Sequence, residues 1–296
     1  MTTRTLTAET AGPVTIDATL LGHGGIVTVR AEADCEHATL TIRTADEGGE
    51  AADAVRAATL RQSGTTLYAS VQGRGGIGGG TTINTGGGRS VVQSVISNNY
   101  GSTVVQIGGD IVGGNFGGGD VVIKGSSPIE ITAVVPEGSS VIGRTQSADI
   151  VAEGAVLNVS GDTQSGDVRA GHVSKVAAHT QSGDVRVEKA AFIDAKTQSG
   201  DIRLGSTDVV EGNTMSGDIA IADFGGSARL KTMSGDIRVH ATAGGDLSAR
   251  TMSGDINVSA TENALADDLD VITSTMTGSV RAPQRRMGGY QPRRRR

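Results

Sequence analysis

The chain has 296 residues with 45 glycines but only three Phe, three Tyr and no Trp, too few aromatic side chains for a conventional globular core of this size. A single cysteine, Cys35, excludes an internal disulfide framework and a cysteine-based zinc site. The net charge is −6, and no apolar run approaches the roughly 20 residues of a membrane span.

The N-terminal segment MTTRTLTAET has neither the basic region nor the apolar stretch of a signal peptide, which predicts a soluble cytoplasmic protein. Residues 1–72 then predict a compact β-rich head. Alternating apolar and polar residues indicate half-buried strands, and an alanine-rich stretch without Gly or Pro indicates a helix. The expected strands are 14–16, 26–29, 38–42 and 65–72, and the expected helix is 50–61.

Residues 73–127 form a glycine-rich insertion in which short β-branched pieces, such as 90–92 and 103–107, indicate irregular β arcs rather than a flexible linker. Within it, residues 73–78 match the pattern G-x-G-x-x-G of phosphate-binding loops. No helical pattern follows, so a phosphate would lack the helix N-terminus that normally binds it. We interpret the match as chance in a glycine-rich stretch.

Residues 128–281 are dominated by one repeated phrase, Thr-(Gln/Met)-Ser-Gly-Asp-(Ile/Val), which follows an alternating strand at 128–135. A nearly fixed period below 20 residues is typical of stacked supersecondary units. The sequence therefore predicts an all-β fold, a β-solenoid (β-helix) of about eight 17–19-residue rungs. The copies begin at Thr145, Thr163, Thr180, Thr197, Thr214, Thr232 and Thr251, with a decayed copy at Thr275.

Alternation on both sides of the phrase defines one rung. Val176, Ala178 and Thr180 occupy every second position before the corner, and Val185 and Val187 do so after it. Each rung is thus a strand, a Ser-Gly corner, a second strand and a corner of variable length. Equivalent inward residues should stack at the strand spacing of about 4.8 Å.

The repeated Gly and Asp are interpreted as a structural corner. Glycine there permits either a positive φ or a close approach between rungs, and Asp can accept hydrogen bonds from the amides of its own corner. The corner residues are Gly166, Asp167, Gly183, Asp184, Gly200, Asp201, Gly217, Asp218, Gly235, Asp236, Gly254 and Asp255.

The aligned aspartates could also form a Ca²⁺ ladder. Calcium-binding β-rolls, however, surround the ion with several oxygens from a different turn, whereas each rung here supplies one carboxylate. Arginines follow two residues later on the same strand face, at Arg169, Arg186, Arg203 and Arg238. This spacing favours charge compensation, so we expect no metal and no cofactor.

The second residue of the phrase changes from Gln in the first copies to Met in the later ones, at Met215, Met233, Met252 and Met276. If the position faces outward, the methionines form an exposed stripe suited to adaptable protein contacts. Alternatively, the corner folds them inward as packing.

Residues 282–296 predict a disordered, arginine-rich tail. From 281 to the end there are seven Arg and no acid, so with −6 overall and +7 here the rest of the chain carries −13. Such a tail could contact an anionic partner, either nucleic acid or lipid headgroups, or it could solubilise the chain or bind to the acidic rod. Its last four residues are Arg293, Arg294, Arg295 and Arg296.

Nothing in the pattern indicates catalysis. The five histidines are scattered, and the expected solenoid has short corners with only Phe192 and Phe224 as aromatic residues. An enzyme acting on acidic polysaccharides is the rival, but one Asp ladder does not place two carboxylates in unlike environments.

The T-x-S-G-D-(I/V) repeats, the strand ending AVVPEGSS at 133–140 and the preceding β head resemble the bacterial family named putative adhesins. These are β-strand-repeat proteins of unknown function, many of them actinobacterial. The resemblance covers residues 1–72 and roughly 128–281, and it implies a β-solenoid with an adhesin-like role and no catalytic residues.

Two hypotheses follow. The first is a non-enzymatic, adhesin-like scaffold that presents repeated surface ladders to a protein partner. The second is a self-assembling cytoskeletal polymer like the bactofilins, because solenoid ends expose unpaired strand edges unless they are capped. The head offers a cap for one end, and residues 260–274 together with the tail offer one for the other, so we expect a monomer or a small oligomer.

Overall fold

The computed structural model describes residues 1–72, 81–85, 89–93, 105–107, 110–112 and 127–283, and every structural statement below concerns these residues. They fall into two compact units. Unit 1 comprises residues 1–156 and 161–166, and unit 2 comprises residues 157–160 and those from 167 onward. The G-x-G-x-x-G match at 73–78 and residues 284–296 of the predicted arginine-rich tail lie outside the described residues.

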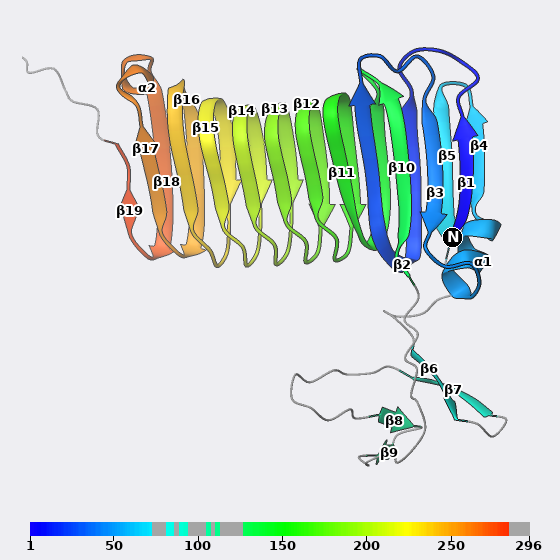
Figure 1. The fold of residues 1–296 in the computed structure, drawn as a ribbon. Coiled ribbons are helices and arrows are strands. Elements are labelled where there is room, and N and C mark those ends of the chain that lie inside the picture. Colours follow the sequence, from blue (N-terminus) through cyan, green and yellow to red (C-terminus); the bar gives the residue numbers. More distant parts are fainter. Residues whose placement is uncertain (73–80, 86–88, 94–104, 108–109, 113–126, 284–296) are drawn as a thin grey trace, which may run out of the picture. The chain divides into compact units, whose positions relative to one another are not determined.

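Unit 1 is built from the head and from the strands that follow the insertion. β10 lies between β2 and β3, parallel to the first and antiparallel to the second, and β1 pairs with β3. β2 also pairs in parallel with β5 and β11 (Figure 1). The elements are β1 Thr2–Thr7, β2 Thr15–Glu32, β3 Thr39–Thr44, α1 Glu50–Ala57, β4 Thr59–Ser63, β5 Thr66–Gln72, β10 Ile129–Pro136 and β11 Ser140–Thr163.

Two short antiparallel pairs lie within the glycine-rich insertion. They are β6 Thr81–Thr85 with β7 Arg89–Gln93, and β8 Val105–Ile107 with β9 Asp110–Val112. Of the insertion, residues 81–85, 89–93, 105–107 and 110–112 therefore form strands.

The predicted helix at 50–61 is too long, because α1 ends at Ala57. Ala58 is already extended, with φ −56° and ψ 141°, and β4 then pairs antiparallel with β5. The intrinsic helix preference of an ordinary residue is only a few tenths of a kcal/mol, roughly. The backbone hydrogen bonds that β4 forms with β5 outweigh this preference over a few residues.

Unit 2 consists of parallel strands stacked rung on rung, and Figure 1 shows them side by side from β12 to β18. The prediction of an all-β solenoid is confirmed. Its elements are β12 Val168–Thr180, β13 Val185–Lys196, β14 Ile202–Asn213, β15 Ile219–Lys231, β16 Ile237–Ser253, β17 Ile256–Ala260, α2 Glu262–Ala266, β18 Leu269–Thr277 and β19 Val280–Arg281.

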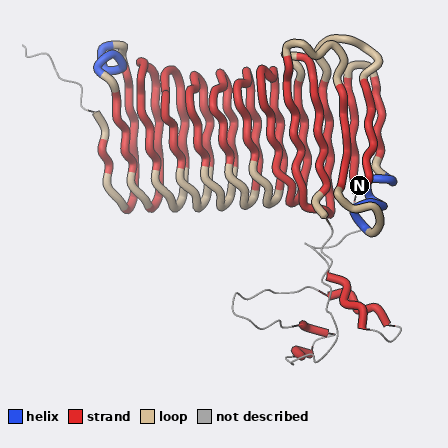
Figure 2. The backbone as a smooth tube through the Cα atoms, in the orientation of Figure 1, coloured by secondary structure: helices blue, strands red, loops and turns tan. Residues whose placement is uncertain are grey.

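The inward positions of unit 2 form one dry ladder. Val176, Ile193, Val210, Ala228 and Leu247 are in register on successive strands, and each is buried. Stacking at about 4.8 Å per rung keeps identical positions in contact, so a chain without Trp still buries a continuous core. The Thr-x-Ser-Gly-Asp corners of unit 2 form a single row of loops along one edge (Figure 2).

The last rung is assembled from two halves. β16 pairs with β17 through its first part and with β18 through its last part, and α2 occupies the variable corner between them. Thr261 caps α2 by accepting a hydrogen bond from the backbone N–H of Ala264. Among the described residues, no helix is long and apolar enough to cross a bilayer.

Candidate interaction face

The corner threonines from Thr145 to Thr251 are buried, and at Thr197 and Thr214 the hydroxyl makes two hydrogen bonds. In the corner at Thr197, Oγ1 accepts the backbone N–H of Gly200 at 3.0 Å and donates to the carbonyl of Gly183 on the preceding rung at 3.3 Å. The same pair of bonds recurs at Thr214, where the distances are 3.1 and 3.3 Å. Threonine therefore both fills the interior and ties one corner to the next.

The corner glycines are required by close backbone approach. A Cβ placed on Gly200 would lie 1.8 Å from the carbonyl oxygen of Gly183, and one on Gly217 would lie 1.9 Å from that of Gly200. Of the two explanations that the sequence left open, contact between rungs applies along the stack. A positive φ is added only at the last two corners, at Gly254 and Gly278, both with φ 146°.

The aspartates bond the next rung rather than the amides of their own corner, which corrects the expectation from the sequence. Oδ1 of Asp184 accepts the backbone N–H of Asp201, and Oδ1 of Asp201 accepts that of Asp218. A carboxylate at the edge of a parallel stack can reach the amide of the following rung, because neighbouring strands are only about 4.8 Å apart. Equivalent bonds run from Asp184 to Asp167, Asp236 to Asp218 and Asp255 to Asp236.

The arginines bind the other carboxylate oxygen. Oδ2 of Asp184 contacts Arg186 at 2.7 Å and Arg203 at 3.2 Å, so one carboxylate pairs with guanidinium groups of two rungs. Arg238 bridges Asp218 and Asp236 in the same way. These aspartate oxygens are used in hydrogen bonds and ion pairs, and among the described residues no group of three or more His, Cys, Asp or Glu is arranged to hold a metal ion.

The outward residues of the strands leading into each corner form a surface that we call the pre-corner face. Parallel register aligns them into rows that cross β12, β13, β14, β15, β16 and β18. The row farthest from the corner is Lys175, Phe192, Val209, Ser227, Asp246 and Asp270. The next is Ala177, Asp194, Glu211, Arg229, Ser248 and Ile272, and a third is His179, Lys196, Asn213, Lys231, Arg250 and Ser274.

The methionines of the repeat form the fourth row, at the corner itself. Met215, Met233 and Met252 are 49%, 46% and 49% exposed, and Met276 in the last rung is 78% exposed. Successive corners are joined by backbone bonds, such as Ser234 N–H to the carbonyl of Met215 at 2.9 Å, which holds the row in register. The methionine side chains therefore face outward rather than packing into the core.

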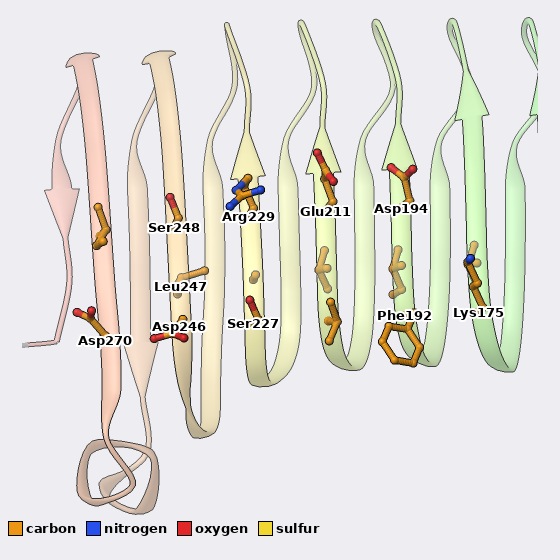
Figure 3. Close-up of a pocket in the computed structure, with 16 residues that line it drawn as sticks. Lys175, Phe192, Asp194, Glu211, Ser227, Arg229, Asp246, Leu247, Ser248 and Asp270 are labelled. Carbon is orange, nitrogen blue, oxygen red and sulfur yellow. The ribbon is translucent and has the colours of Figure 1, made fainter.

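A shallow hollow of about 530 Å³ lies on the same face, farther from the corners. Phe192 and Val209, 54% and 41% exposed, are register neighbours at its apolar end. Figure 3 shows Asp194, Glu211 and Arg229 in a parallel row closer to the corners. The hollow thus combines an exposed aromatic ring with a charged border, a composition typical of contact sites.

The charges beside the methionines are mainly basic. Lys231 and Arg250 are exposed register neighbours, whereas Lys196 forms an ion pair with Asp194 at 2.9 Å. The hydrogen bond that Lys196 donates to the Asp194 carboxylate raises the pKa of Lys196, so this side chain stays charged at neutral pH. The face therefore offers apolar side chains next to fixed positive charge.

The hollow was not anticipated from the sequence. Phe192 and Val209 lie just after the variable corner, where the regular alternation of inward and outward side chains is interrupted. The direction of a side chain there depends on how the backbone bends at this corner. The sequence does show that Phe192 and Val209 each stand five residues before a corner threonine, so they occupy equivalent positions on successive rungs.

A family model described as Toastrack DUF4097 matches residues 109–292, more than half of the chain. The chain belongs to this family. The match confirms the resemblance to a family of β-strand-repeat proteins that the T-x-S-G-D phrase suggested. No curated protein matches the chain.

The chain is also similar to several solved structures. A protein from Parabacteroides distasonis named as a putative lipid binding protein is 13% identical, with 95% of this chain and 97% of the other covered and a TM-score of 0.46. A putative adhesin from Bacteroides fragilis is 13% identical over 94% and 95% of the two chains, with a TM-score of 0.42. A putative adhesin from Parabacteroides merdae is 10% identical over 95% and 97%, with a TM-score of 0.39.

Proposed function

We propose that the chain is a non-enzymatic, adhesin-like interaction scaffold that binds a protein partner through the pre-corner face of unit 2. The observation that carries this proposal is the row of half-exposed methionines at consecutive corners. Methionine is flexible and polarisable, so a row of them adapts to a partner's surface, and exposed apolar rows on a soluble protein usually mark contact sites.

The rest of the face supports the same role. Phe192 and Val209 add a second apolar cluster on the same strands. Hot spots of binding energy concentrate on such large side chains, while surrounding charges contribute mainly to specificity and to the rate of encounter. A rigid stack holds all of these groups at fixed spacing, so little ordering entropy is lost on binding.

The test uses residues that the chain itself places at equivalent positions. The triple variant M215Q/M233Q/M252Q puts the Gln of Gln181 and Gln198 into the later corners, and Phe192→Ser puts the residue of Ser227 into its row. Both changes are compatible with the fold and remove apolar surface. The matched control is Glu188→Ala with Lys189→Ala, two exposed residues of the variable corner.

Purified wild-type chain and these variants are used as bait, and bound proteins are quantified by mass spectrometry and then re-tested as purified components. We expect a defined partner whose affinity falls at least about tenfold in the triple variant and in Phe192→Ser, as is typical for contact hot spots. The control should bind normally. A partner that binds all variants equally would contradict this surface, and the absence of any saturable partner would contradict the proposal.

A further inference from the structure

The core of the solenoid is open at its last rung. Leu247 and Ala249 on β16 are 1% and 0% exposed, but their register partners on β18, Val271 and Thr273, are only half-buried. On the other strand, Ile256 is 1% exposed and its partner Val280 is 43% exposed. Positions that are dry inside the stack therefore meet solvent at its end.

This end forms a hollow of about 620 Å³. Leu265 of α2, Leu269, Val271 and Ala282 supply apolar lining, and acidic residues that include Asp270 stand at its border. The hollow is therefore mixed in character, and the hydrophobic effect favours covering the aliphatic part of its lining.

The strand that borders the opening is unprotected. β18 pairs with β16 along one edge, and among the described residues its other edge has no strand partner. Residues 271–280 include no charged residue and no proline. Natural edge strands usually carry lysine, proline or a bulge to prevent pairing, so this edge is a template for another strand.

Residues 284–296, which follow the last strand, are poorly suited to that role. They contain six arginines, one proline and no β-branched side chain, so their composition offers neither strand propensity nor aliphatic bulk. A second copy of the same edge supplies both. Because the run at 271–280 is uncharged, it can meet itself without repulsion.

Charge selects the direction of such a pairing. The segment that leads into β18 is acidic, with Glu262, Asp267 and Asp268 followed by Asp270 in the strand itself. The first basic residue after them is Arg281 on β19. In an antiparallel pair, the acidic start of one β18 lies beside the far end of the other, where Arg281 follows. A parallel pair would place acid beside acid.

We propose that two copies of the chain form a symmetric dimer, with the β18 edges paired antiparallel across a two-fold axis and the two open core ends covering each other. A two-fold interface uses the same surface on both copies and closes on itself. It therefore leaves no free edge at this end and opposes growth into filaments. The dimer uses the free edge of β18 and the open end of the core, whereas the partner contacts tested above lie at Met215, Met233, Met252 and Phe192 on earlier rungs, so either proposal can fail alone.

The test is the mass of the full-length chain in solution, measured by light scattering and sedimentation across a wide concentration range. We expect twice the chain mass for the wild type and one chain mass for V271K/T273K. The introduced lysines can reach solvent through the open end of a monomer but would be buried and unpaired in the dimer. Ser248→Lys, one rung further in on β16, is the matched control and should remain dimeric.

Charge variants give a second readout that does not depend on apolar residues. Asp270→Lys and Arg281→Asp should each weaken the dimer about tenfold, and the double variant should recover most of the affinity, with the wild-type dimer weakening as salt rises. The proposal would be overturned by a wild-type chain that stays monomeric at all concentrations. This is the result expected if residues of the same chain cover the open end. Filaments would also overturn it, as would a dimer unaffected by V271K/T273K and by the charge variants.

Discussion

The Oδ1 atom of Asp184 accepts the backbone N–H of Asp201 at 3.0 Å, so a side chain of one rung fastens the backbone of the next. The other oxygen of the same carboxylate holds Arg186 and Arg203. The backbone bond and the ion pairs are separable. Asp201 keeps its ion pair with Arg203 but lacks a second one, because Ala220 replaces the arginine of the next rung, and its Oδ1 still accepts the N–H of Asp218 at 2.9 Å.

Replacing Asp184 therefore tests two contributions separately. Asp184→Ala removes the acceptor for the Asp201 amide and should cost about 1–3 kcal/mol of unfolding free energy. Asp184→Asn keeps an oxygen acceptor and loses only half-exposed ion pairs, which are worth about 0–1 kcal/mol. Urea denaturation of the two variants should place Asn closer to the wild type than to Ala. Equal losses would mean that the ion pairs, not the backbone bond, carry the stability.

The repeat could be predicted to form a solenoid because alternation and period are properties of sequence alone. The inward direction of Val176, Ala178 and Thr180 follows from their parity and agrees with their burial. The target of the Asp184 carboxylate does not follow from the sequence. A local turn and a bond to the next rung use the same residue types, and only the spacing of rungs in three dimensions decides between them.

The candidate interaction face could likewise be predicted only in part. The Gln-to-Met change was visible in the sequence, but its outward direction depends on how the backbone turns between Thr214 and Gly217, where simple alternation ends. The opening at β18 was not visible either. Val271 and Thr273 have an ordinary inward pattern, and their exposure arises only because no further rung lies on them among the described residues.

The hydroxyl of Thr197 provides a second test of the corner. Thr197→Val keeps the shape but leaves the Gly200 N–H without its acceptor, so we expect a loss of about 1–3 kcal/mol in thermal or urea unfolding. Thr197→Ser keeps the oxygen and should lose less, since only a methyl group is removed. If Val were tolerated better than Ser, packing rather than hydrogen bonding would explain the buried threonine.

Acid should loosen the last corner. The backbone N–H of Ser279 donates to Asp255 and, together with the Ser279 side chain, holds the pKa of this carboxyl below its ordinary value. A lowered folded-state pKa gives a contribution to stability that is present above the unfolded-state pKa and is lost as pH falls through the folded-state pKa. We expect an NMR titration of the Asp255 carboxyl to show a midpoint below that of a free aspartate. In Ser279→Pro, which lacks the N–H, the midpoint should move back up, and an unchanged midpoint would contradict this cause.

The corner glycines give the most severe expected effect. In Gly200→Ala the new Cβ would overlap the carbonyl oxygen of Gly183, 1.8 Å away, and both partners are backbone atoms held by the stack. Neither can move as the end of a flexible side chain can, so the rungs must separate locally. We expect a loss of about 3 kcal/mol or more, at the upper end of the cost of overpacking.

The matched control for this substitution is Gly48→Ala. Gly48 has no atom within 4 Å of an added Cβ and no positive φ, so alanine there should leave the unfolding free energy within about 0.5 kcal/mol of the wild type. Circular dichroism and urea unfolding of both variants measure the difference. If Gly200→Ala unfolded like the control, the repeated glycine would not be required by the approach of one rung to the next, and that explanation of the corner would have to be abandoned.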